Sequence, residues 1–450
     1  MSAGIRILFL FPWFCAASAM GGDTWPAFHN GGNASVEAGD LPLRWSPDEG
    51  IAWSVELPGY GQSAPVVWKD RVYVTCAQGD PKVRLRVVAL DAQTGMRIWA
   101  RELAATVQTE NGNTVSRAAP TPLADEEGLY VLFESGDLFA LTHAGELRWR
   151  TGLFDEDENA FQNRHGYGAS PAQTKEAVIV LVDHQGPSYL LALSKTTGKP
   201  LWKTERAPRS SWSSPKVTRV AEREQVIVSS NGTVDGYDAQ TGRRLWSCEG
   251  ISGNTIPSAT VVGDRVYVGA GVGRGESGES AAASNCCLRI APETAEGYEV
   301  LWKAENAVCS YMSPLVHRGC VYYVNSVGVV YCLDAETGQE HYAKRLGGAC
   351  WAQPIGAGNR VYFFEKNGQT IVLRAGAEFE KLATNRWEAP FAAPEAPASP
   401  AEKPAGEHAE SSGGAGGYPQ EGPVVYGAAA VDGAIFIRLG ERLVCVCGEL

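Results

Sequence analysis

The chain has 450 residues, of which 51 are acidic and 39 basic, so its net charge is −12. This acidic excess argues against nucleic acid as a partner, because proteins that follow phosphates need lysine and arginine to displace counterions. Hydrophobic residues make up 44% of the chain and charged residues 20%, which excludes a disordered protein, and 51 glycines with 13 tryptophans favour short strands and tight turns over a helical bundle.

Residues 1–19 have the pattern of a cleavable signal peptide. Arg6 and the amino terminus supply a positive start, residues 7–15 are apolar, and Ala17-Ser18-Ala19 forms a small-residue cleavage site. The apolar stretch is too short to cross a bilayer, so no transmembrane anchor is expected. A buried first strand is the alternative. We predict an exported protein, periplasmic or extracellular, that is cleaved near Ala19.

A repeated pattern then runs along the chain. Residues 89–99 read ALDAQTGMRIW, and the pattern returns at 192–202, 236–246 and 332–342, with looser copies elsewhere. Each copy predicts a β-hairpin: a strand ends at Asp, whose carboxylate accepts backbone N–H bonds, and Thr-Gly supplies the turn. A second hairpin precedes each copy, with Pro, apolar residues, a polar turn and an aromatic strand. Each repeat therefore supplies four antiparallel strands, A to D.

Large aromatic residues mark the D strands, and their spacing gives the architecture. They are Trp53, Trp99, Trp149, Trp202, Trp246, Trp302 and Tyr342, about 40 to 56 residues apart, as in four-stranded propeller blades. Seven blades begin near residues 62, 119, 169, 213, 256, 312 and 353. In the eighth, residues 424–447 supply three strands and residues 51–57 the fourth. The prediction is an all-β, eight-bladed propeller that is closed by the amino-terminal strand, with residues 20–450 as a single domain.

Two further features concern residues outside the repeat pattern. Residues 388–422 are rich in Pro, Ala, Glu and Gly, which predicts a disordered insertion before the last blade. Ten cysteines follow Cys15, and none has CxxC spacing, so neither a zinc site nor a thioredoxin-like site is indicated. Most lie in strand-like runs, where a buried free thiol is common, but an oxidising compartment also permits disulfides. Their pairing stays open.

The motif Ala-x-Asp-x-x-Thr-Gly-x-x-x-Trp resembles the tryptophan-docking repeat of PQQ-type β-propellers, and the resemblance covers almost all of the mature chain. That family includes quinoprotein alcohol dehydrogenases, BamB-like assembly factors and many exported bacterial propellers. The opening Trp25-Pro26-Ala27-Phe28-His29-Asn30 resembles the exported group, which usually carries Trp-Pro-x-Phe-Arg-Gly, so His29 and Asn30 depart from it. No lipobox precedes it, which limits the likeness to BamB to the repeats.

In such a propeller, the loops that enter the innermost A strands form one rim of a central channel. Aromatic, Arg, His and Asn side chains gather there, which suits a flat or anionic small molecule, or a peptide. The alternative is that these are ordinary loop residues, whose polar atoms satisfy the hydrogen-bonding groups at the channel mouth. The rim candidates are Gln62, Arg117, Arg164, His165, Tyr167, Trp212, Asn254, Tyr311, Trp351 and Tyr426.

The leading hypothesis is an exported, non-catalytic propeller that binds a protein, peptide or small ligand at this rim. The alternative is a quinoprotein oxidoreductase that uses PQQ and calcium, as the resemblance implies for some members. Such enzymes often carry a vicinal disulfide, but Cys286-Cys287 lies in a strand, where neighbouring side chains point to opposite faces. A propeller hydrolase is a poorer third hypothesis, because no repeat places a carboxylate pair. No metal ligands or catalytic residues are predicted.

Overall fold

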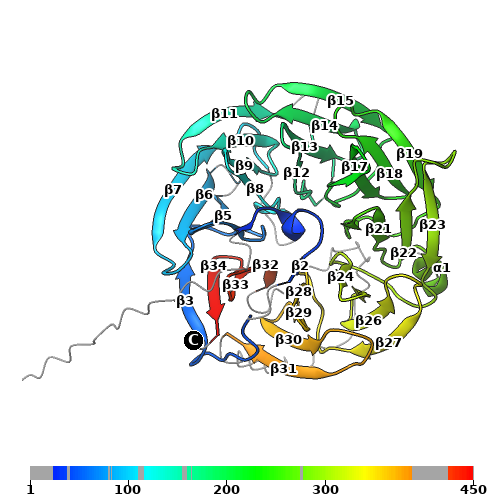
Figure 1. Cartoon of the computed structure of the whole chain (residues 1–450). Coiled ribbons are helices and arrows are strands. Elements are labelled where there is room, and N and C mark those ends of the chain that lie inside the picture. Colours follow the sequence, from blue (N-terminus) through cyan, green and yellow to red (C-terminus); the bar gives the residue numbers. More distant parts are fainter. Residues whose placement is uncertain are drawn as a thin grey trace, which may run out of the picture.

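The computed structural model describes residues 24–37, 41–79, 82, 84–109, 116–154, 160–163, 165–273, 277–387 and 424–448. The predicted signal peptide, the insertion at 388–422 and Arg164 lie outside these residues. The strands form eight sheets, which are arranged as a ring around a central channel (Figure 1). The predicted all-β, eight-bladed propeller is confirmed.

Each blade is a four-stranded antiparallel sheet whose strands run outward from the channel in the order A, B, C, D. Blade 1 consists of β4 (Val66–Trp68), β5 (Arg71–Gln78), β6 (Arg84–Asp91) and β7 (Arg97–Ala104), and blade 2 of β8 (Leu123–Asp125), β9 (Gly128–Leu132), β10 (Asp137–Leu141) and β11 (Leu147–Gly152). Blade 3 consists of β12 (Ala172–Gln173), β13 (Ala177–Val182), β14 (Ser188–Ser194) and β15 (Pro200–Arg206), and blade 4 of β16 (Lys216–Val220), β17 (Arg223–Ser230), β18 (Thr233–Asp238) and β19 (Arg244–Glu249). Blade 5 consists of β20 (Thr260–Val262), β21 (Arg265–Val268), β22 (Cys286–Ile290) and β23 (Tyr298–Lys303). Blade 6 consists of β24 (Leu315–His317), β25 (Cys320–Val324), β26 (Val329–Asp334) and β27 (Glu340–Arg345), and blade 7 of β28 (Ile355–Ala357), β29 (Arg360–Phe364), β30 (Gln369–Arg374) and β31 (Lys381–Arg386).

Blade 8 closes the ring with strands from both ends of the described chain. β32 (Val425–Val431), β33 (Ala434–Leu439) and β34 (Arg442–Cys447) form its inner three strands, and β3 (Ile51–Glu56) adds the outer D strand. The pairing runs from Ile51 opposite Val446 to Glu56 opposite Arg442. This confirms the predicted closure, which pairs strand edges that would otherwise stay open.

The repeated motif joins each blade to its neighbour. Asp91 Oδ1 accepts hydrogen bonds from the backbone N–H groups of Gln93 and Thr94, which fixes the turn between β6 and β7. Trp53 of the preceding blade donates from Nε1 to Ala92 O at 3.1 Å, and its ring lies against Gly95, where a Cβ would meet it at 2.6 Å. Gly95 also has a φ of +69°, so only glycine suits this position. The tryptophans that mark the repeats are therefore contacts between blades.

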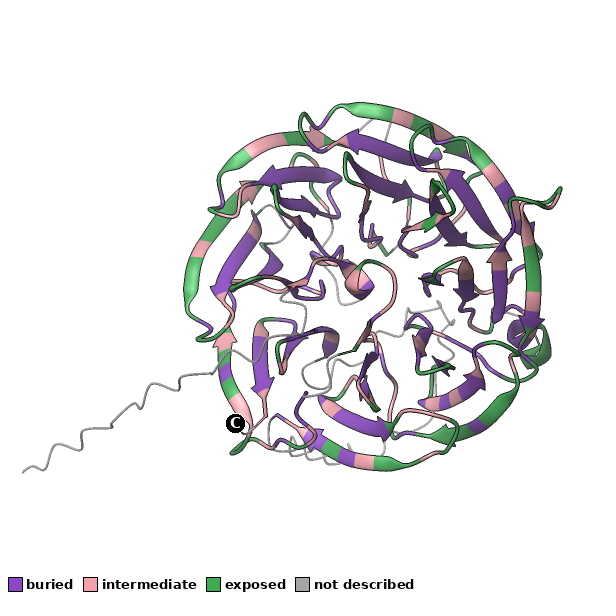
Figure 2. Ribbon diagram, viewed as in Figure 1, coloured by how far each residue is buried: buried purple, intermediate pink, exposed green. Residues whose placement is uncertain are grey.

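Burial follows the position of a strand within its blade (Figure 2). The middle strands, such as β10 and β13, are buried along their whole length, whereas the outer strand β7 is largely exposed. Blades pack face to face, so the middle strands contact a neighbour on both sides and consist of continuous apolar runs. The ten cysteines of the described residues are free thiols.

A segment of the chain that precedes the blades occupies the central channel, which the sequence did not predict. β1 (Thr24–Trp25) pairs with β4 of blade 1, and β2 (Ser35–Val36) runs parallel to β28 of blade 7. Between them, the short 3₁₀ helix η1 (Phe28–Gly31) lies at the centre of the ring (Figure 1). We call residues 24–36 the channel segment.

The channel segment bonds to successive A strands around the ring. Pro26 O accepts a hydrogen bond from Ala124 N in blade 2 at 2.8 Å, and Gly32 O accepts one from Val261 N in blade 5 at 3.4 Å. Asn33 bonds to blade 6. A-strand backbone groups that would otherwise face the channel are thus satisfied by the chain itself. The helices of the described residues do not combine the length and apolar character that a bilayer span requires.

Candidate functional site

The two faces of the ring carry different connections. Strand direction alternates within each blade, so the loops that enter the A strands and the turns between strands B and C share one face. The turns that join A to B and C to D lie on the other. We call the first the entry face, and the predicted rim residues that the structure describes belong to its loops or to the adjoining end of an A strand.

Four aromatic side chains lie in a row on the entry face, across blades 6, 7, 8 and 1. They are Tyr311, Trp351, Tyr426 and Tyr60, and successive ring centroids are 5.8, 6.2 and 5.8 Å apart. The hydroxyl groups of Tyr60 and Tyr426 are hydrogen-bonded to each other. We call this row the aromatic arc. The first three members are predicted rim residues that the structure brings together.

Cations lie over two rings of the aromatic arc. Lys366 Nζ is 4.5 Å from the centroid of Trp351, and Arg117 Cζ is 4.8 Å from the centroid of Tyr60. Burial and the neighbouring Tyr426 raise the pKa of Tyr60, so its hydroxyl stays neutral and able to donate a hydrogen bond. The arc thus offers aromatic faces, hydroxyl groups and two positive charges on one surface.

His165 and Trp212 form a second, smaller aromatic group, from blades 3 and 4. Their ring centroids are 5.7 Å apart in an edge-to-face arrangement, and His165 is exposed. Trp212 is held by its Nε1, which donates to Gly166 O at 3.0 Å, and by its backbone N–H, which donates to Thr255 O at 2.7 Å. This group is fixed in place and open to solvent on one side.

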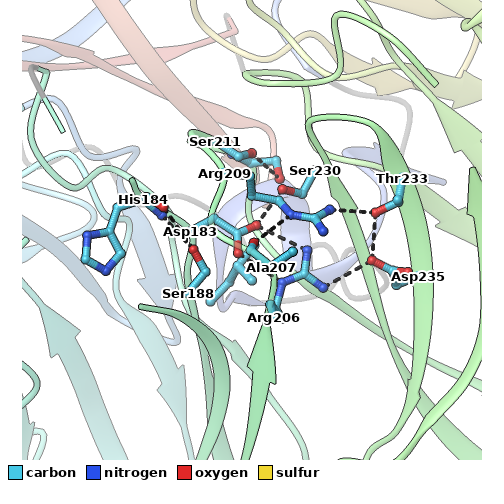
Figure 3. Close-up of polar contacts among 12 residues, drawn as sticks. Asp183, His184, Ser188, Arg206, Ala207, Arg209, Ser211, Ser230, Thr233 and Asp235 are labelled. Atoms are coloured by element: carbon cyan, nitrogen blue, oxygen red, sulfur yellow. Dashed lines mark hydrogen bonds and ion pairs between the residues drawn. The ribbon is translucent and has the colours of Figure 1, made fainter. Parts of the chain in front are cut away.

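A polar network connects Asp183, Arg206 and Asp235 near Arg209, which lies in the loop between β15 and β16 (Figure 3). Arg206, at the end of β15, donates from Nε to Asp183 Oδ1 at 2.9 Å and from Nη1 to Asp235 Oδ2 at 3.1 Å. Burial opposes its charge, but the two carboxylates outweigh burial and raise the pKa of Arg206. Arg209 donates to Thr233 Oγ1 at 2.8 Å. The buried bond from Arg206 to Asp235 joins blades 3 and 4, and the partly buried bond from Arg209 to Thr233 holds the entry-face loop.

Three of the predicted rim residues have structural contacts instead of a free surface. Tyr167 is only 2% exposed, and its hydroxyl donates to Leu181 O at 2.9 Å, so its side chain belongs to the core. Asn254 is fully buried, and its side chain bonds to Ser229, Gly232 and Thr233.

The third, Gln62, accepts a hydrogen bond from Arg117 N at 2.8 Å through Oε1 and links the loops of blades 1 and 2. Its position in the loop places the side chain between two blades, where it ties one to the other.

Two basic residues meet inside the channel: His29, which the sequence marked only as a departure from the family pattern, and Lys216, which it did not single out. Lys216, at the start of β16, donates from Nζ to Phe28 O at 3.0 Å and lies 4.6 Å from the centroid of that ring. Burial lowers the pKa of Lys216 to about 7. Burial, followed by the charge of Lys216, lowers the pKa of His29 well below its usual value. Both groups are enclosed by the channel segment, so their protonation states affect how stably this segment is held in the channel.

The side chains that the structure describes do not support the calcium and PQQ of the alternative hypothesis. The described part of the chain has no group of three His, Cys, Asp or Glu residues that could hold a metal ion. Cys286 and Cys287 are buried in different apolar clusters, on opposite faces of blade 5, and burial raises the pKa of the Cys287 thiol to about 12. The channel segment also occupies the centre of the ring.

Two members of this surface were missed by sequence reasoning. Tyr60 lies two positions before Gln62, in the same loop that enters the A strand. An aromatic residue at that position could have been recognised as a rim candidate from the sequence. Lys366 lies in the turn between strands B and C of blade 7. Strand alternation places this turn on the same face as the loops that enter the A strands, so the turns between strands B and C also supply rim residues.

Comparison with known proteins identifies the family. A family model described as outer membrane protein assembly factor BamB matches residues 16–186, 159–285 and 290–405. Outer membrane protein assembly factor BamB of Burkholderia pseudomallei (strain K96243) is 25% identical over 230 residues, which are 50% of this chain and 54% of that protein. The match thus spans about half the length of this curated relative.

Solved structures share the fold at low identity. BamB from Moraxella catarrhalis is 13% identical with a TM-score of 0.57, over 88% of this chain and 98% of that one. The quinohemoprotein alcohol dehydrogenase from Comamonas testosteroni is 14% identical with a TM-score of 0.60, over 96% of this chain and 82% of that one. At such low identity, these similarities to solved structures show only the propeller fold. The family follows from the family model, whose matches span most of the chain. The chain belongs to the outer membrane protein assembly factor BamB family of PQQ-like β-propellers.

Proposed function

We propose that this chain is an exported, non-catalytic propeller that binds an extended segment of another protein on its entry face. The observation that carries the proposal is the aromatic arc, in which Tyr311, Trp351, Tyr426 and Tyr60 form one surface across four blades. Tyrosine, tryptophan and arginine are the residues most enriched where proteins bind one another. Because the channel segment occupies the channel, a ligand lies across the face and does not enter the ring.

The family name supports a particular class of partner. Relatives are described as outer membrane protein assembly factors. Strands of outer-membrane barrels alternate apolar and polar residues and carry aromatic girdles near both ends. Such strands present aromatic and apolar side chains to the arc while they are still unpaired. A signal peptide cleaved near Ala19 and a single propeller domain over residues 20–450 belong to the same proposal, since the partner would be met outside the cytoplasm.

Peptide binding to matched variants tests this function. The probe is a fluorescently labelled peptide of about ten residues with the alternating pattern and one aromatic girdle residue of a barrel strand. We expect Trp351→Ala to weaken its binding by about tenfold or more, as truncation of a central aromatic contact does. Leu201→Ala is the control, because Leu201 is 54% exposed on the outer strand of blade 3, away from the arc. Equal binding by wild type and Trp351→Ala would contradict the proposal.

The dehydrogenase alternative has its own test. Purified protein would be mixed with PQQ and calcium, separated from free quinone, and assayed by quinone absorbance and dye-linked alcohol oxidation. We expect the quinone to be removed with the small molecules and no dye reduction above that of a blank, because the described side chains do not assemble a calcium site. Retained quinone together with alcohol turnover would replace the proposed function.

A further inference from the structure

A cleft of about 1360 Å³ lies on the entry face over blade 5. One wall comes from the turn between strands B and C, which contains the short helix α1 (Gly278–Ala283). The loops that enter blades 5 and 6 supply the other walls, and Tyr311 of the aromatic arc lies at the edge. The cleft is therefore continuous with the surface assigned to protein binding.

The α1 wall is held rigidly against blade 5. Asn285 donates from Nδ2 to Ala270 O at 3.0 Å and to Ala281 O at 2.9 Å, and its Oδ1 accepts a hydrogen bond from Ala270 N at 2.8 Å. Asn285, Ala281 and Ala282 are buried. The helix therefore has a fixed position, and the cleft beside it is preformed.

The described lining of the cleft is negatively charged. It contains the carboxylates of Glu279 and Glu305 and no lysine, arginine or histidine. Both glutamates are exposed, and neither forms a hydrogen bond or ion pair within the described residues. Elsewhere on the surface some exposed glutamates are paired, such as Glu102 with Arg86 and Glu299 with Arg289, whereas others, such as Glu126, form no ion pair within the described residues. Within the described residues, the two carboxylates of the cleft therefore form no ion pair.

Exposed apolar side chains accompany these carboxylates. Val272 is 55% exposed, Ile256 is 38% exposed and Tyr311 is 37% exposed, and all three line the cleft. Other exposed apolar residues, such as Leu147 and Leu201, lie singly on outer strands. Apolar surface that gathers in a concave site indicates binding, whereas isolated exposed residues need no explanation.

We propose that this cleft binds a basic stretch of polypeptide in which lysine or arginine alternates with apolar residues. The cationic side chains would face Glu279 and Glu305, and the apolar ones would cover Val272 and Ile256. The inference rests on the proposed function, because Tyr311 belongs to both the cleft and the aromatic arc. It adds a charge preference: the end of the bound segment that lies over blade 5 is basic.

Two peptides of equal length test the charge preference by fluorescence anisotropy. Both share an aromatic residue and valines, and they differ only in carrying two lysines or two glutamates. We expect the lysine peptide to bind wild type more tightly, and Glu279→Gln with Glu305→Gln to weaken it by about fivefold, from the usual strength of exposed ion pairs. Its affinity should also fall as sodium chloride rises to about 0.5 M, because salt screens exposed charges.

The control variant carries the same change on the opposite face. Glu126 and Glu222 lie in exposed turns between strands A and B of blades 2 and 4, so Glu126→Gln with Glu222→Gln removes equal charge away from the cleft. We expect this variant to bind the lysine peptide as wild type does. Val272→Ser adds an uncharged change within the cleft and should weaken both peptides.

The possible outcomes separate this inference from the function on which it rests. If both peptides bind equally and remain sensitive to Trp351→Ala, the charge preference is wrong and the proposed function stands. If neither peptide binds, both proposals fall. A cleft that binds a neutral oligosaccharide, and loses it in Val272→Ser, would overturn the polypeptide assignment.

Discussion

Aromatic residues gather in two regions near the axis of the ring, and they differ in what they contact. In the channel segment, Trp25 is 1% exposed and packs in the largest apolar cluster, and Phe28 lies under Lys216. In the aromatic arc, Tyr311 is 37% exposed, and its ring contacts the ring of Trp351 at a centroid distance of 5.8 Å. The same residue types thus stabilise the ring in one region and remain available to a partner in the other.

The largest effect should come from the channel segment. Trp25→Ala removes a fully buried indole and leaves a cavity, so we expect the free energy of unfolding to fall by about 3–5 kcal/mol. Urea denaturation measures it. Trp351→Ala in the arc should cost less than about 1 kcal/mol, because the ring is only partly buried. Similar losses for the two variants would erase the distinction between the regions.

The channel segment should also make stability depend on pH through Lys216. Its pKa is about 7 in the folded protein, against about 10.4 in an unfolded chain. Between these values the unfolded state binds one more proton than the folded state, so this group makes stability rise with pH. Relative to Lys216→Met, wild type should gain up to about 1.4 kcal/mol per pH unit above pH 7.

Urea denaturation at several pH values between 7 and 9 checks this slope. His29, the other titratable group beside Lys216, has a lowered pKa in the folded protein, and an unfolded histidine with a pKa of about 6.5 is largely neutral above about pH 7.5, so His29 contributes little over most of this range. Parallel pH profiles for wild type and Lys216→Met would show that the amine is not enclosed as described.

A smaller loss of folding stability is expected when the contact between the channel segment and blade 6 is removed. Asn33 donates from Nδ2 to Val316 O at 2.7 Å and accepts from Val316 N at 3.2 Å through Oδ1. Asn33→Ala leaves both backbone groups of Val316 without these partners, which should cost about 1–3 kcal/mol. The thermal midpoint reports it. Asn306→Ala, at an exposed position of the cleft, should change the stability by less than about 0.5 kcal/mol.

The smallest effect on stability should come from the arc itself. Tyr311→Ala removes a ring with a large exposed fraction, so the free energy of unfolding should stay within about 0.5 kcal/mol of wild type. Binding of the barrel-strand peptide should nevertheless weaken. A variant that unfolds easily would place Tyr311 with the structural aromatics of the channel.

The repeats made most of the fold predictable, because each copy carries its own turn signal and its own docking tryptophan. Asp91 and Gly95 mark a turn by local chemistry alone, and the strand at residues 51–57 was predictable because it lacked partners in its own neighbourhood. The channel segment was not predictable. Its two strands have two residues each, and its contacts join positions that are distant in the sequence, such as Asn33 and Val316.

For the candidate site, the sequence predicted the face of the ring on which the residues lie, but it did not predict how exposed each side chain is. Tyr311 and Trp351 lie together because each precedes the A strand of its blade by four residues, and Tyr426 joins them from the start of β32 in the next blade. Tyr167 and Asn254 come from the same kind of loop, yet they turn inward, since inter-blade packing and local hydrogen bonds decide their orientation. Loop position does not distinguish these cases, so the sequence alone could not separate ligand-facing residues from buried ones.

The closure of blade 8 has a consequence for the order of folding. β3 pairs with β34, and Glu56 forms an ion pair with Arg442, so the first blade-forming strand waits for nearly the last part of the chain to be synthesised. The channel segment must wait as well, because its partner β28 also comes late. Contacts of such wide sequence separation form slowly. Until they form, β34 of blade 8 and β28 of blade 7 lack these partners, and unpaired strand edges can pair with other strands instead.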